Sequence, residues 1–272
     1  MARISNSEAD NIIDSEFRVL DKGFVRLIDY MGGDSRIVQA ARVSYGNGTK
    51  TRREDSALIN YLLRNEHTSP FEQVVLTFHI KAPIFIARQW VRHRTARINE
   101  ISGRYSVMKD EFYVPQPADV KLQNVINKQA RANESPLEDQ VSNFLSTVQA
   151  DQRESYKRYD SYIQGKIARE LARINLPLSL YTEFYWQIDL HNLFHFLRLR
   201  LHSHAQKEIR DYAQVLAQCA KAVAPIAYSA FEQHRLGAQT FTKSELEELL
   251  TLDFSGLSQE LQNKLKAVNN EN

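Results

Sequence analysis

The stretch from Arg88 to Arg104 carries the residues of this chain that are best suited to bind an anion. It holds five arginines and one histidine in seventeen residues, against a single acid, Glu100. A guanidinium group presents forked N–H donors that match two oxygens of a phosphate or carboxylate, and it keeps its charge at working pH. The stretch contains no lysine, which favours recognition of an anion by its geometry over non-specific electrostatic attraction. We therefore expect a local anion-binding site here.

Other interpretations of the histidines and arginines remain open. An arginine-rich run is often a solvated helix face, and it can also bind nucleic acid, with Trp90 and Tyr105 as stacking surfaces. A metal hydrolase could use His191 and His195, which lie four residues apart on an expected helix. The usual metalloprotease helix carries a glutamate directly after the first histidine, and Asn192 stands there instead. We therefore expect no metal.

Three residues are nominal candidates for a covalent nucleophile: Cys219, Ser69 and Ser102. Cys219 lies in an alanine-rich helical stretch, where a small buried thiol is the ordinary outcome. A serine nucleophile needs a base within hydrogen-bond reach. The residues that follow Ser102, Gly103 and Arg104, supply no base, because an arginine cannot accept a proton. We expect Cys219 to be structural and Ser102 to bind its ligand by hydrogen bonding.

The composition indicates a globular protein that binds small ligands. The chain has 272 residues, of which 43% are hydrophobic, enough to bury a core. Its net charge of +2 is too small for a protein that binds nucleic acid over most of its surface. The single cysteine excludes an internal disulfide and fits a reducing cytoplasm. No run of eighteen apolar residues and no signal-like N-terminus occur, so a cytoplasmic protein without membrane contact is expected.

Hydrophobic periodicity predicts strands separated by helices. Strands are expected over 24–30, 71–80 and 178–188. Helices are expected to begin near Asp34, Glu54, Pro83, Ser135, Leu190, Ser203 and Thr242. The glycine fingerprint of dinucleotide-binding folds is absent. We expect a mixed α/β (α+β) fold with a central sheet flanked by helices, and not a Rossmann fold.

The domain organisation expected from these elements is a single catalytic domain over residues 1–272. Residues 114–133 are rich in proline and side-chain amides and poor in apolar groups, which predicts a polar surface excursion. The asparagine-rich C-terminal tail is expected to fray.

Capping residues sharpen several of these boundaries. Asp34 is expected to accept from the free amides of the helix turn that follows it. Ser135 and Glu138, with Pro136 between them, predict a helix start, as do Ser203 with Gln206 and Thr242 with Glu245. The helix that begins at Pro83 should reach Arg92, so that the arginine stretch starts on a helix and continues as a loop.

The order of residues in the arginine stretch resembles the signature of the flavin-dependent thymidylate synthases. Arg92-His93-Arg94 is followed after seven residues by Ser102, with Asn99-Glu100 and Gly103-Arg104-Tyr105 at fixed offsets. Further segments that resemble this family are Gly33-Asp34-Ser35 with Ala41-Arg42-Val43-Ser44, His67-Thr68-Ser69-Pro70-Phe71-Glu72, and Arg173-Ile174-Asn175-Leu176-Pro177 through Arg200. The resemblance covers roughly residues 34–212.

The resemblance implies a reaction and a set of ligands. The enzyme would move a methylene group from methylenetetrahydrofolate onto deoxyuridine monophosphate (dUMP) and form dTMP, with reduced FAD as hydride source and NADPH as reductant of the flavin. It would be a homotetramer with active sites shared between subunits. The implied FAD contacts are Ser69, Arg92, His93, Arg94, Glu100, Asp189, Leu190, His191 and His195. The implied nucleotide contacts are Gln89, Trp90, Val91, Arg92, Glu100, Ile101, Ser102, Gly103, Arg104, Arg173 and Arg200.

The resemblance also assigns individual roles. Arg200 would be the catalytic residue: at the uracil edge, a permanent cation can stabilise negative charge that develops on N3 and so activate C5. His67 would position the flavin or the folate. The chain departs from the family pattern at Arg97, where serine is common, at Asp189, where asparagine is usual, and at His191, which is often arginine. A carboxylate at position 189 cannot donate a hydrogen bond as an amide does.

Overall fold

An antiparallel sheet forms the centre of the molecule. The computed structural model describes residues 4–43, 52–126, 128, 130–252, 255–259 and 261–263. Five strands pair in the order β1-β2-β3-β5-β4, and every pair is antiparallel. The strands are β1 (Glu16–Val19), β2 (Gly23–Met31), β3 (Val75–Pro83), β4 (Arg97–Glu100) and β5 (Tyr181–Asp189). This confirms the mixed α/β fold and excludes a Rossmann fold, whose sheet is mostly parallel.

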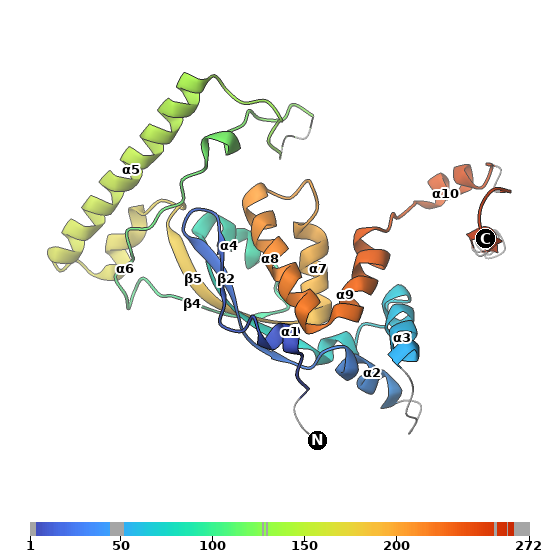
Figure 1. Cartoon of the computed structure of the whole chain (residues 1–272). Helices are drawn as coiled ribbons and strands as arrows, with labels where there is room; N and C mark the ends of the chain where they lie inside the picture. The colour runs from blue at the N-terminus through green and yellow to red at the C-terminus, as the bar shows by residue number, and fades with distance from the viewer. Residues whose placement is uncertain are drawn as a thin grey trace.

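Helices pack around this sheet, and some extend away from it (Figure 1). The α-helices are α1 (Ser7–Asp10), α2 (Asp34–Arg42), α3 (Arg52–Arg64), α4 (Ile84–Trp90), α5 (Glu138–Gln164), α6 (Arg169–Ala172), α7 (Leu190–Arg200), α8 (Lys207–Val223), α9 (Pro225–Phe231) and α10 (Lys243–Leu249). Short 3-10 turns cover Phe71–Gln73, Pro117–Asp119 and Arg173–Asn175, and a π-helical turn covers Glu232–Leu236. Helix α8 lies against the sheet, whereas α5 stands at one side of the body.

The core joins the sheet to the helices that carry the arginine stretch. Trp90, at the end of α4, is fully buried among aromatic rings, with centroid separations of 5.5 Å to Phe184 of β5 and 5.0 Å to Phe196 of α7. From α8, the Tyr212 hydroxyl donates to the carbonyl of Lys81 in β3 at 2.7 Å. Burying large aromatic rings supplies much of the stabilisation of such a core. The ends of α4 and α7 are thereby held together.

The sheet differs from the sequence prediction in several strand boundaries and in two strands, and the strand expected from residue 178 begins at Tyr181. The strand expected from residue 71 begins at Val75, because Pro70 adopts a helical conformation that continues into the 3-10 turn Phe71–Gln73. The short strands β1 and β4 were not predicted. All four side chains of β4 are exposed, so no buried face leaves an alternating pattern in the sequence.

Several helix starts also differ from prediction. Helix α2 begins at Asp34 itself, and the Asp34 carboxylate accepts from the amides of Ile226 and Ala227 at 2.9 Å, so that it caps the distant helix α9. The prediction that Asp34 caps its own turn is therefore wrong. The predicted start at Ser135 is also wrong: α5 begins at Glu138, where the Gln140 side chain accepts from the Leu137 amide at 3.2 Å.

Three further helix boundaries can be compared with the sequence prediction. Helix α8 begins at Lys207 without a side-chain cap from Gln206, whose amide bonds elsewhere, so the predicted cap at Ser203 is wrong. Helix α4 ends at Trp90, two residues before the predicted end. The predicted start of α10 is confirmed, because Thr242 and Glu245 form a capping box. Ser44 and the asparagine-rich tail lie outside the described residues.

Candidate active site

Arg200 and His93 form the centre of the candidate site. Arg200 ends α7 and His93 follows α4, and the Nε group of Arg200 donates to Nε2 of His93 at 3.1 Å. A guanidinium cannot accept, so His93 Nε2 is the acceptor and the ring proton lies on Nδ1. Burial, the Arg200 charge and His195 lower the pKa of His93 to about 4. His93 is therefore neutral at working pH.

Gln89 of α4 completes this group. A terminal guanidinium nitrogen of Arg200 lies 3.5 Å from the Gln89 carbonyl oxygen. The Gln89 side-chain amide donates to Oε1 of Gln206 at 2.6 Å. Trp90, the neighbouring residue, has a fully buried side chain, which leaves its backbone as the part able to meet a ligand. A stacking surface at Trp90, as a nucleic-acid module would need, is not available in the folded chain.

The loop after β4 lies beside Arg173. The amide of Ile101 donates to the Glu183 carbonyl at 2.9 Å, and the Thr182 hydroxyl donates to the Glu100 carboxylate at 2.6 Å. A Cβ atom at Gly103 would meet Cδ of Arg173 at 3.0 Å, so the glycine permits this close approach. The structure thus places Arg173, predicted from a distant segment, against the loop that contains Ser102.

Ser102 itself makes local hydrogen bonds. Its hydroxyl oxygen accepts from the Arg104 amide at 3.3 Å, and its carbonyl accepts from the amides of Tyr105 and Ser106 at 3.0 Å each. Within the described residues, no histidine or carboxylate hydrogen-bonds to its hydroxyl. Arg104 pairs with Glu170 of α6, with 3.2 Å between Nε and the carboxylate. This geometry suits a serine that donates to a ligand.

A second group of predicted residues surrounds a cavity of about 260 Å³. His67, His191 and His195 line it, together with Arg198 and Arg235. His93 lies next to this cavity, since its ring centroid is 6.1 Å from that of His195. Burial, the Arg198 charge and the neighbouring His191 lower the pKa of His195. The cavity and the Arg200 group are therefore adjacent.

Other predicted FAD contacts lie outside the lining of this cavity. Asp189 caps α7: its carboxylate accepts from the amide of Asn192 at 2.9 Å and from the Asn192 side chain at 2.7 Å. The Leu190 side chain is fully buried. Ser69 precedes the 3-10 turn at Phe71 and is exposed. Within the described residues, no three His, Cys, Asp or Glu side chains gather in a way that could hold a metal ion.

Some arginines of the site have no acidic partner among the described residues, whereas two of them, Arg104 and Arg235, do. Pairs with a carboxylate are formed by Arg42, Arg104, Arg131, Arg158 and Arg235. Within the described part of the chain, no carboxylate pairs with Arg92, Arg94, Arg173, Arg198 or Arg200. Burial lowers the pKa of Arg200 below its ordinary value, and no negative charge of the described residues compensates for this burial. These cations are available to an anionic ligand.

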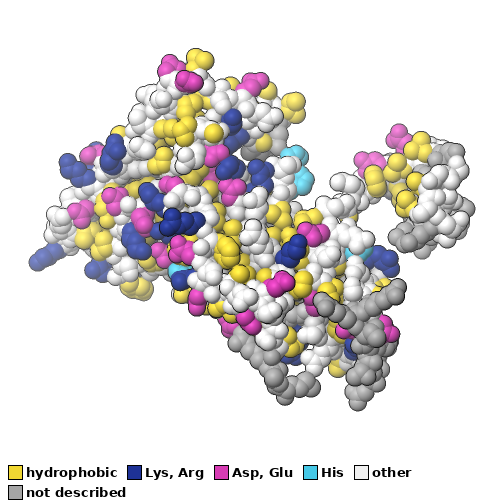
Figure 2. Space-filling model, viewed as in Figure 1, with side chains coloured by type: hydrophobic (Ala, Val, Ile, Leu, Met, Phe, Trp, Pro, Cys, Tyr) yellow, Lys and Arg dark blue, Asp and Glu magenta, His cyan; other side chains and the backbone are white. Residues whose placement is uncertain are grey.

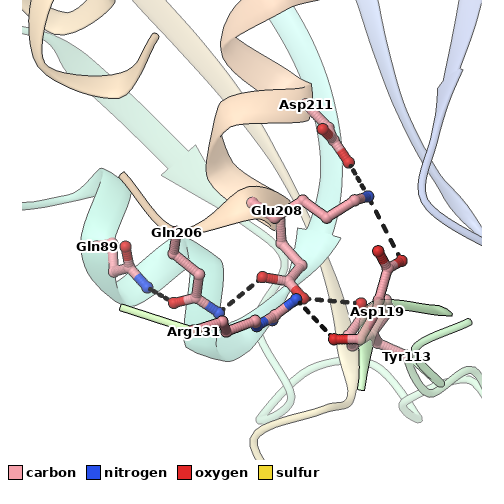
Figure 3. A network of polar contacts seen from close by, with 8 residues as sticks. Gln89, Tyr113, Asp119, Arg131, Gln206, Glu208 and Asp211 are labelled. Atoms are coloured by element: carbon pink, nitrogen blue, oxygen red, sulfur yellow. Dashed lines mark hydrogen bonds and ion pairs between the residues drawn. The ribbon is translucent and has the colours of Figure 1, made fainter. Parts of the chain in front are cut away.

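A polar network behind Gln89 was not predicted (Figure 3). Glu208 is fully buried, and its carboxylate accepts from Arg131, from the Tyr113 hydroxyl at 2.9 Å and from the Gln206 amide at 2.9 Å. Burial alone would raise the pKa of Glu208, but Arg131 and the hydrogen bonds bring it below the ordinary value. One sequence signal existed: Glu208 stands four residues before Tyr212 and eight before Leu216, on the buried stripe of α8.

Comparisons with known proteins identify the family. A family model described as thymidylate synthase complementing protein matches residues 26–226. A flavin-dependent thymidylate synthase of Treponema denticola is 63% identical over 240 residues, which cover 88% of this chain and 90% of that protein. The chain belongs to the flavin-dependent thymidylate synthase family. A flavin-dependent thymidylate synthase of Thermus thermophilus is 57% identical over 231 residues, covering 85% of this chain and 83% of that protein.

Solved structures agree with this family. A UMP/dUMP methylase of Streptomyces cacaoi, PolB, bound with 5-Br dUMP, superposes with a TM-score of 0.74 at 30% identity. The alignment covers 81% of this chain and 99% of that one. The same methylase bound with 5-Br UMP gives a TM-score of 0.72. The chain is thus a flavin-dependent enzyme of thymidylate synthesis, as the resemblance implied, and neither the nucleic-acid module nor the metal hydrolase gains support.

The surface of this flavin-dependent thymidylate synthase is consistent with small-ligand binding. Figure 2 shows Lys and Arg side chains interspersed with Asp and Glu on the face drawn, and not a continuous band of one sign. A polymer-binding surface would favour such a band. Among the described helices, none combines the length and the apolar character needed to cross a bilayer.

Proposed function

We propose that this enzyme transfers the methylene group of methylenetetrahydrofolate to dUMP, with FAD as the flavin and NADPH as its reductant. The observation that carries this proposal is a set of arginines on the arginine stretch, at Arg173 and on α7 that have no carboxylate partner in the described part of the chain. Within the described residues, Arg92, Arg94, Arg173, Arg198 and Arg200 have no carboxylate partner. A dianionic nucleotide phosphate and the diphosphate of FAD are ligands of matching charge.

On the nucleotide side, Arg200 would act at the base. Its Nε bond to the neutral His93 fixes the plane of the guanidinium, and one terminal N–H approaches the Gln89 carbonyl at 3.5 Å. The other N–H donors would meet the uracil edge. A cation held there stabilises negative charge as it develops on the ring and makes C5 a better nucleophile. Arg173 and the 101–104 loop, which pack together, would bind the rest of the nucleotide.

The cavity next to this group would hold part of the flavin. Its lining combines apolar side chains with His67, His191, His195 and Arg198, which has no carboxylate partner among the described residues, and these side chains can supply donors to an anionic planar cofactor. Bound reduced FAD would supply the hydride. Asp189 fits less well, because both carboxylate oxygens already accept from Asn192. We expect it to position α7 rather than to contact the cofactor directly.

A homotetramer with shared active sites is part of this proposal. Strand β4 is one of the two edge strands of the sheet, and Ile98 and Ile101 at this edge are 43% and 37% exposed. Arg92 and Arg94 lie on the exposed segment between α4 and this edge. A second subunit that covered this surface would bury these apolar side chains and bring its own residues to the arginines.

The ligand requirements can be tested by omission. The purified enzyme, given dUMP, methylenetetrahydrofolate and NADPH, should form dTMP and show the absorbance of bound FAD. Omitting any one of the three should abolish turnover, and replacing NADPH by chemically reduced flavin should restore it. Turnover that persists without methylenetetrahydrofolate would show that this folate is not the carbon donor.

Shared sites can be tested by mixing inactive variants. Arg92→Ala and Arg200→Ala remove the two predicted ligand groups from different elements. If one site uses residues of two subunits, mixed tetramers regain up to about a quarter of the activity, because some sites receive both intact residues. Absence of regained activity in mixtures whose subunits have exchanged, as checked by sedimentation and mass spectrometry, would contradict a site that takes Arg92 and Arg200 from different subunits.

A further inference from the structure

The buried Glu208 fixes the direction of a chain of hydrogen bonds that ends at Gln89. An ionised carboxylate can only accept. Its Oε1 accepts from Arg131 and from the Tyr113 hydroxyl, and its Oε2 accepts from Nε2 of Gln206. Glu208 is fully buried, so water does not supply alternative partners. Gln206 must therefore turn its amino group toward Glu208.

This orientation determines the next amide in the chain. With its amino group on Glu208, Gln206 presents its oxygen to Gln89, and the Gln89 amino group donates to that oxygen at 2.6 Å. Gln89 must then turn its own oxygen away from Gln206. Figure 3 shows the amino nitrogen of Gln89 directed toward Gln206. Within the described residues, the Gln89 side-chain oxygen accepts no hydrogen bond.

Gln89 lies at the proposed nucleotide site, because its carbonyl oxygen is the one approached by Arg200 at 3.5 Å. We propose that Glu208 and Gln206 are positioning and specificity-determining residues: they make the Gln89 side chain an acceptor that recognises an N–H or O–H donor of the pyrimidine nucleotide. This inference rests on the proposed use of dUMP. It gives a role to the 114–133 segment, since Arg131 anchors Glu208 from there.

The exchange Glu208→Gln tests the inference with almost no change in shape. Arg131 and Tyr113 would hold the new amide by its oxygen, so its amino group would face Gln206. Gln206 would then have to reverse, and Gln89 would present its amino group to the nucleotide. A donor that faces a donor loses the hydrogen bond and leaves both groups unsatisfied, which should raise the Kd for dUMP roughly tenfold to a hundredfold.

The Kd for dUMP is measured by calorimetry on the FAD-loaded enzyme. The Kd for FAD and the melting temperature are measured alongside it, and they separate this effect from a general loss of structure. Tyr113→Phe is the matched control, because it removes a donor from Oε1 of Glu208 but leaves the bond to Gln206. It should bind dUMP within about threefold of the wild type, because the direction of the chain is unchanged.

A double exchange provides the decisive comparison. In Gln89→Glu, a carboxylate faces the oxygen of Gln206, and binding of dUMP weakens through repulsion. Adding Glu208→Gln reverses Gln206, whose amino group then donates to the introduced carboxylate, and an acceptor for the nucleotide is restored. Glu208→Gln should therefore weaken dUMP binding when it is made in the wild type. In the Gln89→Glu variant, the same exchange should strengthen dUMP binding at least about threefold. Exchanges at independent sites do not show such a reversal of sign.

The outcomes distinguish this inference from the proposed function. If the wild type itself binds no dUMP, the proposed substrate is wrong. If the wild type binds dUMP and folded Glu208→Gln binds it equally well, or if its effect has the same sign in both backgrounds, the inference is overturned. If Glu208→Gln does not fold, the variant Gln206→Met tests the inference instead. Its Kd for dUMP should rise while its Kd for FAD stays unchanged. An unchanged Kd for dUMP overturns the inference.

Discussion

Arg200 is held by a neutral histidine: its Nε group donates to Nε2 of His93 at 3.1 Å. A carboxylate in the place of His93 would neutralise the guanidinium, whereas a neutral ring orients it and leaves its charge for the ligand. The proximity of the two groups also accounts in part for the lowered pKa of His93, since the Arg200 charge disfavours a second cation. The pair therefore links the geometry of the site to its protonation state.

Replacing Arg200 by lysine should impair catalysis more than folding. A lysine keeps the positive charge but has neither the Nε donor that binds His93 nor the planar fork. We expect dTMP formation to fall at least about a hundredfold, as for other preorganised groups that stabilise developing charge. The melting temperature and the flavin absorbance should stay close to those of the wild type. Near-normal turnover would remove Arg200 from the catalytic role.

The His93 pKa predicts how stability depends on pH. The unfolded chain protonates His93 near its ordinary pKa of 6.5, and the folded chain only near 4. Between these values the unfolded state binds more protons, so the free energy of unfolding falls as the pH is lowered from 6.5 toward 4. The contribution is fully present above this window.

The variant His93→Gln tests this dependence, because its side-chain oxygen can still accept from Arg200 and it does not titrate. Urea unfolding of the ligand-free enzyme, followed over the same pH window, should show a shallower slope in the variant than in the wild type. His79 and His195, whose pKa values are also lowered, titrate in both proteins and cancel in the comparison. Equal slopes would show that His93 is protonated normally in the folded state.

Ser102→Ala should retain measurable dTMP synthesis. Its hydroxyl oxygen accepts from the Arg104 amide, and no base among the described residues hydrogen-bonds to it. Loss of a single hydrogen bond to the nucleotide costs about 1 kcal/mol, which corresponds to roughly fivefold weaker binding of dUMP. Total inactivity with intact folding and ligand binding would show instead that the hydroxyl takes part in bond making.

Cys219→Ala should leave turnover unchanged within about twofold, because small core changes away from a site act on stability. The thiol is fully buried, and burial raises its pKa to about 12, which keeps it from acting as a thiolate. The exchange should lower the free energy of unfolding by about 1 kcal/mol through the small cavity it leaves. A folded but inactive variant would indicate a thiol mechanism.

Local sequence patterns predicted those parts of the fold that depend on local physics. The buried faces of β2, β5 and α8 leave periodic apolar residues, and the capping box at Thr242 is a contact between near neighbours. Asp34 has the residue type of a cap, but its partners lie about 190 residues away in α9. No local pattern encodes such a partner.

The site also divides into residues that a local sequence pattern reveals and residues that only tertiary packing brings together. The arginine stretch was recognisable because its residue types and order lie within one segment, and the structure places Arg173 and Arg200 beside that segment. Glu208 and Arg131 lie 77 residues apart and were missed. Their partnership depends on the packing of the 114–133 segment against α8, a tertiary contact that residue spacing does not reveal.

The position of Trp90 has a consequence for optical measurements. The chain contains two tryptophans, and Trp90 and Trp186 are both fully buried, with their ring centroids 5.3 Å apart. Their emission therefore comes from a dry environment and should be blue-shifted in the native protein, moving to longer wavelength when water reaches the core. Because Trp90 directly precedes the site segment that holds His93, quenching of this emission by a bound flavin would report on occupancy without any added label.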